Sequence, residues 1–205
     1  MMSIVALISG RGSNLRALVE AGLPVKGVIS NVADAKGLEF ARARGIATRV
    51  VEHHRFPARE AFDAALEREI ETFAPRLVAL AGFMRVLGAV FVRRYSDRLL
   101  NIHPALLPSF PGLDTHARAL AAGVKLHGCT VHFVTAEVDH GPIVIQAAVR
   151  VQPSDTAESL AARVLEQEHV IYPRAVRWFL DGRLLLQNGA VTVKGNDAQL
   201  VLPAD

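Results

Sequence analysis

The chain has 205 residues, 51% of them hydrophobic and 21% charged, and this composition predicts a folded core and excludes an intrinsically disordered chain. The formal net charge is +3, and the basic residues are scattered rather than gathered in a block, which argues against nucleic-acid binding and suits a small anionic substrate. No apolar run approaches the ~20 residues of a membrane span, and the first run leads directly into a glycine loop, so we expect neither membrane attachment nor a signal peptide.

Buried strands alternate with helical patterns in the first half of the chain. Because continuous apolar strands separated by helices are typical of a parallel sheet covered on both faces, we predict a doubly wound, mostly parallel α/β fold here. The predicted strands cover residues 3–9, 25–31, 46–51, 76–82 and 99–104, and the predicted helices cover 15–22, 37–45 and 58–74.

The pattern changes after Leu120. Two strands at 127–135 and 141–151 follow each other too closely for a helical crossover, so we expect them to pair antiparallel. A long helix should begin with Asp155 as its N-cap and Glu158 as the capping-box partner, and end at about Leu180. A hairpin turning at 188–189 follows it. With no linker or repeat in the sequence, we predict one domain spanning 1–205.

The loop Ser9–Leu15 connects the first strand to the first helix. Gly10 and Gly12 permit a tight turn, and the free amides at the start of the helix attract an anion. Ser13 and Asn14 add side-chain donors. The spacing matches neither a dinucleotide fingerprint nor a Walker loop, so a single phosphate is the natural ligand. A plain turn in which Ser13 or Asn14 caps the helix explains the pattern equally well.

Asn101 and His103 lie two positions apart at the end of a predicted strand. Their side chains therefore face the same side, at the sheet edge where α/β proteins bind ligands. An amide and an imidazole together suit an oxyanion that develops at an acyl carbon. Asp139, in a later loop, would orient His103 and favour its charged form. A structural role for His103 and a simple turn at Asp139 are the alternatives.

Two further residues stand out from their apolar surroundings. Cys129 is the single cysteine, so an intrachain disulfide is excluded and a reducing cytoplasm is indicated. Its place in an alternating strand favours a buried core residue over a nucleophile. Glu168 falls on the inward stripe of the long helix, four residues after Val164, where a carboxylate needs a partner. A ligand hydroxyl or an arginine would serve.

These segments together resemble the phosphoribosylglycinamide formyltransferases, a family of folate-dependent enzymes of purine biosynthesis. The resemblance runs from Ile4 to about Gly182 and rests on "ISGRGSNL", "SNVADAKGLEFARARGI", "LAGFMRVL", "LLNIHPALLPSFPGLDTH", "GCTVHFVTAEVDHGPI" and "EQEHVIYPRAVRWF". The Asn-x-His-Pro and Asp-x-Gly-Pro-Ile pair is shared by folate enzymes that transfer formyl groups. The Gly-x-Gly-Ser-Asn-Leu loop points to this family in particular.

The resemblance implies a role for each candidate residue and two substrates, 10-formyltetrahydrofolate and glycinamide ribonucleotide. Residues 1–120 would then form the ribonucleotide-binding half, and residues 121–205 would complete the sheet and the folate site. The implied enzyme needs no metal, is cytoplasmic, and is a monomer or a homodimer. Asn101, His103 and Asp139 would be catalytic; Gly12, Ser13 and Asn14 would bind the phosphate and Glu168 the ribose; Arg59, Met84, Arg85, Val86 and Leu87 would bind the folate.

The sequence departs from the family pattern at two positions, and rival functions remain. Ala105 replaces a usual serine, and Arg11 replaces a small polar residue, which adds positive charge near the phosphate loop. A formyltetrahydrofolate hydrolase would normally carry an extra N-terminal domain, and a methionyl-tRNA formyltransferase would need more chain after Gly182. A non-enzymatic nucleotide-binding module predicts that Asn101, His103 and Asp139 lie far apart.

Overall fold

The computed structural model describes residues 2–202, which form two compact units divided between Asn101 and Ile102. Each unit is described by itself. The boundary falls within a strand, two residues before its end at His103. The expectation of a single domain with a change of character near residue 120 stays a prediction.

The first unit contains five parallel strands, ordered β5-β4-β1-β2-β3. All residues of β1 and β4 are buried, as expected for central strands with both faces covered, and Ala6 of β1 lies between Val28 and Ala79. The strands are β1 (Ile4–Ile8), β2 (Val25–Ser30), β3 (Ala47–Val50), β4 (Leu77–Leu80) and β5 (Leu99–His103). The predicted doubly wound parallel sheet is therefore confirmed.

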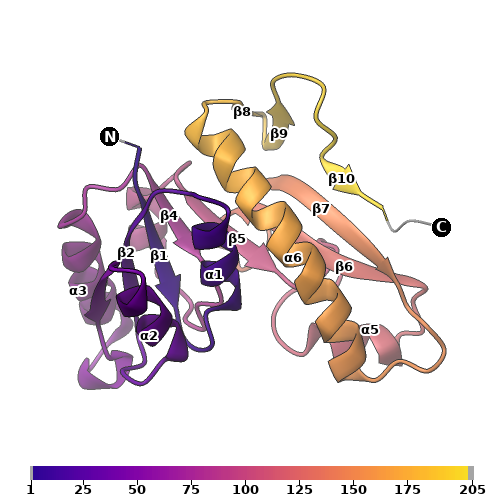
Figure 1. Cartoon of the computed structure of the whole chain (residues 1–205), viewed down its shortest axis with the longest axis horizontal. Coiled ribbons are helices and arrows are strands. Elements are labelled where there is room, and N and C mark those ends of the chain that lie inside the picture. The colour runs from indigo at the N-terminus through magenta and orange to yellow at the C-terminus, as the bar shows by residue number, and fades with distance from the viewer. Residues whose placement is uncertain (1, 203–205) are drawn as a thin grey trace. The chain divides into compact units, whose positions relative to one another are not determined.

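Helices connect these strands in the order α1 (Ser13–Glu20), α2 (Lys36–Ala43), α3 (Arg59–Glu71) and α4 (Ala89–Arg94) (Figure 1). A short 3-10 helix, η1 (His53–Arg55), precedes α3. The four-residue spacing of Phe62, Leu66 and Ile70 buries one stripe of α3, as its amphipathic pattern predicts. Helix α4 was not predicted.

The second unit is built on the antiparallel pair β6 (Leu126–Phe133) and β7 (Ile143–Arg150), which confirms the expected pairing. Figure 1 shows the long helix α6 (Ala157–Leu180) crossing these strands. The predicted hairpin is present as β8 (Leu184–Gln187) and β9 (Ala190–Val193). Two elements were not predicted, α5 (Thr115–Ala121) and β10 (Leu200–Val201), which pairs parallel to β7.

The start of α6 differs from the prediction. Thr156, not Asp155, is the N-cap, and its hydroxyl accepts from the amide of Ser159, which completes the capping box in place of Glu158. Asp155 instead accepts hydrogen bonds from the guanidinium of Arg163 and from the amide of Gln152, 2.8 Å away. An ion pair with a residue two turns into the helix therefore removes the aspartate from the cap.

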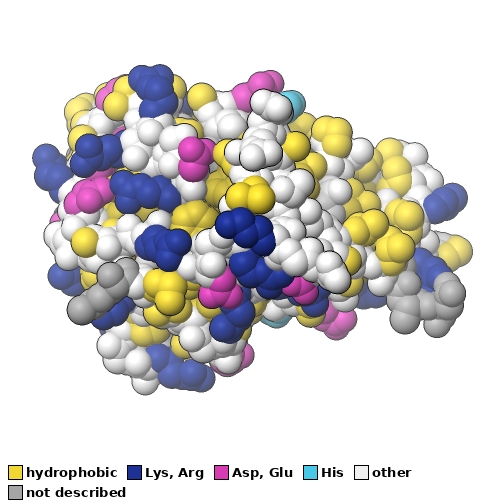
Figure 2. All heavy atoms as spheres, turned by 90° about the horizontal axis from the view of Figure 1, so that it is seen from above, with side chains coloured by type: hydrophobic (Ala, Val, Ile, Leu, Met, Phe, Trp, Pro, Cys, Tyr) yellow, Lys and Arg dark blue, Asp and Glu magenta, His cyan; other side chains and the backbone are white. Residues whose placement is uncertain are grey.

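Charged side chains are interspersed on the surface. Figure 2 shows basic groups with acidic and apolar groups among them on the face in view. Several arginines of the first unit pair with glutamates: Arg49 with Glu69 at 3.3 Å, and Arg94 with Glu67 at 3.1 Å. Exposed pairs of this kind contribute little to stability. Much of the positive charge is therefore locally compensated.

Candidate active site

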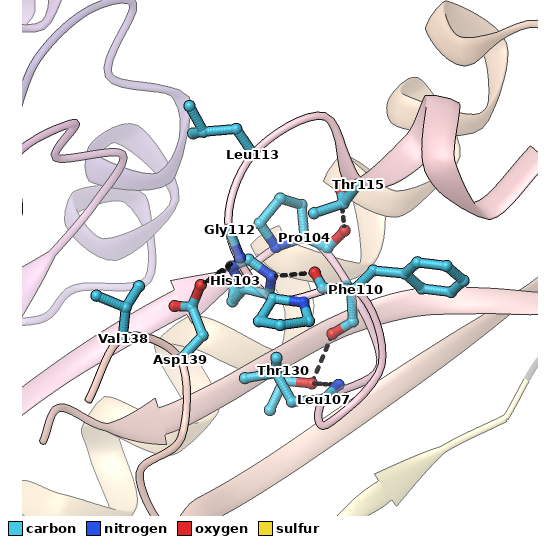
Figure 3. A network of polar contacts seen from close by, with 12 residues as sticks. His103, Pro104, Leu107, Phe110, Gly112, Leu113, Thr115, Thr130, Val138 and Asp139 are labelled. Carbon is cyan, nitrogen blue, oxygen red and sulfur yellow. Dashed lines mark hydrogen bonds and ion pairs between the residues drawn. The ribbon is translucent and has the colours of Figure 1, made fainter.

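His103 ends strand β5 and faces Asp139, which lies in the loop between β6 and β7 (Figure 3). The Nδ1 atom of His103 is 3.4 Å from Oδ2 of Asp139, and both side chains are largely buried. The Nε2 atom of His103 is 3.0 Å from the carbonyl oxygen of Phe110. Both ring nitrogens of His103 therefore face oxygen atoms of neighbouring groups.

The conformation of Asp139 is unusual and is held in place. Its φ of 58° is in the left-handed region, which aspartate tolerates better than most residues. The amide of Gly112 donates to Oδ2 at 2.8 Å, and Nε2 of the buried His132 lies 3.7 Å from Oδ1. The carboxylate is thus held between a backbone donor and two imidazoles.

The segment that follows His103 is anchored by buried hydroxyls (Figure 3). Thr130 donates to the carbonyl of Ala105 at 2.6 Å and accepts from the amide of Leu107 at 3.0 Å. Thr115 donates to the carbonyl of Pro104 at 2.7 Å. These bonds fix the chain that carries the Phe110 carbonyl, so they also fix the orientation of the His103 ring. No feature of the sequence indicates this role of Thr130.

Neighbouring histidines remain neutral. His127 is buried, and its Nε2 is 3.2 Å from Nδ1 of His116. Burial, followed by the charges of His116 and His103, lowers the pKa of His127 to about 4. Burial also lowers the pKa of His132. Neither residue is suited to carry a proton at neutral pH.

The glycine loop of the first unit is tightly packed. Gly12 has a φ of 75°, and a Cβ there would come within 2.7 Å of the backbone of Gly37, at the start of α2. Helix α1 begins at Ser13 without a side-chain cap, so neither alternative cap of the loop is used. Its first amides are the groups that attract an anion. Asn14 is buried and Ser13 half-buried.

The segment Met84–Leu87, which we call the lip, follows β4 in the same unit. Met84 and Val86 are 65% and 51% exposed, Arg85 is also exposed, and Leu87 is buried. Arg59, at the start of α3, is exposed, and its Cδ lies 3.9 Å from where a Cβ on Gly88 would be. An exposed apolar edge with two cations nearby suits a flat ring system that carries carboxylates.

Two other predicted residues lie within the second unit. Glu168 is 7% exposed on the inward stripe of α6, as expected. Cys129 is fully buried, and burial together with the charge of Glu168 raises the pKa of its thiol, which excludes a reactive thiolate at neutral pH. Glu168 and the glycine loop belong to different units, so their joint binding of one ligand stays a prediction. Asn101, half-buried, closes the first unit two positions before His103.

Two further features of the described residues concern metal ligands and membrane-spanning helices. Within residues 2–202 no cluster of three His, Cys, Asp or Glu side chains could bind a metal ion. Over the same range, no helix combines the length and apolarity required to cross a membrane.

A parallel α/β sheet with a histidine–carboxylate pair beyond a strand end is typical of enzymes that use acid–base chemistry. The formyl transferase family model matches residues 2–176. The phosphoribosylglycinamide formyltransferase of Escherichia coli is 50% identical over 95% of this chain and 94% of its own. The solved structure of the Coxiella burnetii phosphoribosylglycinamide formyltransferase is 47% identical, with a TM-score of 0.91 over 95% of this chain and 94% of that one. The chain belongs to the formyl transferase family.

A more distant relative bears on the rival hydrolase. The solved formyltetrahydrofolate deformylase of Pseudomonas syringae has a TM-score of 0.87 but is only 28% identical, and the match covers 65% of that chain. The deformylase therefore shares the fold over a longer polypeptide. The resemblance expected from the sequence is confirmed at the level of the family, and the hydrolase is the more distant of the two enzymes.

Proposed function

We propose that this protein transfers the formyl group of 10-formyltetrahydrofolate to the primary amine of glycinamide ribonucleotide, a step of purine biosynthesis. The contact between His103 and Asp139, 3.4 Å apart beyond a parallel strand, is the observation that carries the proposal. The 50% identity to the E. coli phosphoribosylglycinamide formyltransferase over nearly the whole of both chains supports the choice of substrates.

The reaction begins when the amine nitrogen attacks the formyl carbon. The carbonyl electron pair moves to oxygen, and the tetrahedral oxyanion is stabilised by the protonated His103 and by the amide of Asn101. Collapse breaks the bond to folate N10, which takes up the proton that the amine loses, relayed by Asp139 through water.

Binding would draw on the remaining predicted residues. The amides at Gly12, Ser13 and Asn14 would bind the phosphate, because the uncapped start of α1 carries a partial positive charge. Glu168 would accept hydrogen bonds from the ribose hydroxyls. Arg59 and the lip, with Arg85 among its residues, would bind the folate. The enzyme would act in the cytoplasm as a monomer or homodimer, without a metal and without nucleic acid.

The test is an assay for tetrahydrofolate release with and without glycinamide ribonucleotide. We expect turnover only with the acceptor; turnover without it would instead identify a hydrolase, and folate-independent nucleotide binding alone would identify a binding module. His103→Ala at saturating substrates should reduce kcat by about 100-fold or more. Asn101→Ala should lower kcat more than it raises KM, because its amide acts mainly on the transition state. Near-normal kcat in His103→Ala would refute the mechanism.

A further inference from the structure

Ser9 links the strand end before the glycine loop to the lip. It directly follows β1, and its amide donates to the carbonyl of Gly82 at 3.0 Å. The amide of Met84, the first residue of the lip, donates to the Ser9 hydroxyl at 2.7 Å. The hydroxyl in turn donates its own proton to Oδ1 of Asn31 at 2.6 Å. The acceptor lone pair on Ser9 is thereby directed at Met84.

Asn31 fixes the direction of that hydroxyl. It is 3% exposed, directly after β2, and its Nδ2 lies 3.1 Å from Nδ1 of His53 in η1. With its amide nitrogen directed at His53, its oxygen is left to accept from Ser9. Ser9, Asn31 and His53 lie in the connections that follow β1, β2 and β3. Together they direct the Ser9 hydroxyl oxygen, as a hydrogen-bond acceptor, at the backbone of the lip.

Asp63 anchors the other end of the lip. This residue of α3 is 6% exposed, and its Oδ2 accepts a hydrogen bond from the amide of Gly88 at 2.7 Å. Burial is the largest influence on Asp63 and raises the pKa of its carboxyl, while the Gly88 amide and the charges of Arg59 and Arg85 oppose this. A buried carboxyl on a helix face is costly unless it is bonded. Here Oδ2 is bonded to the residue that follows the lip, while Oδ1 is buried without a hydrogen-bond partner among the described residues.

We propose that Ser9 and Asp63 are positioning residues, which hold the lip from its two ends in the shape that binds the pterin ring of the folate substrate. This inference rests on the proposed function. The lip belongs to no helix or strand, so it has no ladder of backbone bonds of its own. Fixing a residue costs conformational entropy, which a free lip would lose on binding and an anchored lip has already lost.

The chain offers matched variants for each anchor. Ser9→Ala removes the acceptor for Met84. Its control is Ser3→Ala, because Ser3 directly precedes β1 where Ser9 follows it. Ser3 is buried, and its hydroxyl donates a long bond of 3.4 Å to the carbonyl of Ala74. Asp63→Ala removes the acceptor for Gly88, whereas Asp63→Asn removes the charge but keeps a carboxamide oxygen in its place.

The experiment measures binding of tetrahydrofolate by calorimetry, together with steady-state kinetics and the melting temperature of each variant. Loss of one hydrogen bond is worth about 1 kcal/mol, so Ser9→Ala and Asp63→Ala should each weaken tetrahydrofolate binding about fivefold. The KM for folate should rise in parallel. The KM for the ribonucleotide and kcat at saturation should change less than twofold. Asp63→Asn and Ser3→Ala should bind tetrahydrofolate like the unaltered protein.

Hydrogen exchange keeps the test decisive if a variant is unstable. The amides of Met84 and Gly88 should exchange faster in Ser9→Ala and Asp63→Ala respectively, relative to core amides of β1 in the same sample. Unchanged tetrahydrofolate binding in both variants, a loss confined to kcat, or equal loss in Asp63→Asn and Asp63→Ala would each overturn the inference. Transfer activity in the unaltered protein tests the proposed function separately, because tetrahydrofolate binding is measured without the ribonucleotide.

Discussion

Replacement of Asp139 by asparagine removes one charge from the candidate catalytic pair and leaves its surroundings intact. Asparagine tolerates the φ of 58°, and its carboxamide oxygen can still accept from Gly112. At 3.4 Å, two unit charges interact by about 5 kcal/mol at an effective dielectric constant of about 20. Because desolvation of both groups offsets part of this energy, we expect Asp139→Asn to lower kcat about 10²- to 10³-fold, with KM values changed less than about threefold.

The assay is steady-state formation of tetrahydrofolate with both substrates varied, alongside a thermal melt. Asp139→Ala is the comparison variant, since it also loses the Gly112 bond and is less suited to the left-handed backbone. It should melt earlier than Asp139→Asn while having a similarly low kcat. If Asp139→Asn kept kcat within about fivefold of the unaltered protein, the charge on Asp139 would not act on His103 during the reaction.

Three further predictions concern binding and stability. Gly12→Ala should lose about 1–2 kcal/mol of unfolding free energy and raise the KM for the ribonucleotide, because the new Cβ would meet the Gly37 backbone at 2.7 Å. Gly10 has open space around it, so the control variant Gly10→Ala should melt at the same temperature as the unaltered protein. Glu168→Gln should raise that same KM about 10-fold or more, by weakening hydrogen bonds to the ribose; an unchanged KM would contradict this. Hydrogen bonds from Arg163 hold the pKa of Asp155 far below its ordinary 3.8, so the stabilising effect of the Asp155 carboxylate is complete above pH 3.8 and is lost as the pH falls. The difference in urea midpoint between Asp155→Asn and the unaltered protein should therefore narrow below pH 3.8. A difference that stays constant would contradict this prediction.

The parallel sheet was predictable because its signal is local. Strands buried on both faces must be apolar throughout, as in Ile4–Ile8 and Leu77–Leu80, and the helices between them carry a clear stripe. The antiparallel pair β6–β7 was predictable from the length of its connection alone. In both cases the residues that identify the elements lie close together in the sequence, so no contact between distant segments has to be known.

The predictions of secondary structure failed where two residues could serve as the same helix cap and where an element is short. Asp155 is as good an N-cap as Thr156 by residue type, and only its contact with Arg163, eight residues later, decides between them. Helices α4 and α5 have six and seven residues, too few to display a reliable 3.6-residue period. β10 has only two residues, and its pairing with β7 depends on tertiary contact.

The residues of the candidate site also differ in how far the sequence indicates them. Asn101 and His103 could be proposed as candidates because the spacing of two and the strand end are both visible in the sequence. The Phe110 carbonyl that faces His103 could not, because a backbone group leaves no signature in residue type. Ser9 and Asp63 were missed for a related reason. Their partners are the amides of Met84 and Gly88, which any residue except proline could supply.

The left-handed backbone at Asp139 restricts how this position can change as the sequence diverges. Glycine and asparagine fit that backbone but carry no carboxylate, and glutamate carries a carboxylate but lacks the short side chain that makes the conformation tolerable. The left-handed backbone and the need for a carboxylate are independent requirements, and aspartate is the residue type that meets both. A lineage that loses Asp139 would have no intermediate that retains both shape and charge, so we expect divergence here to accompany loss of the activity rather than gradual adjustment.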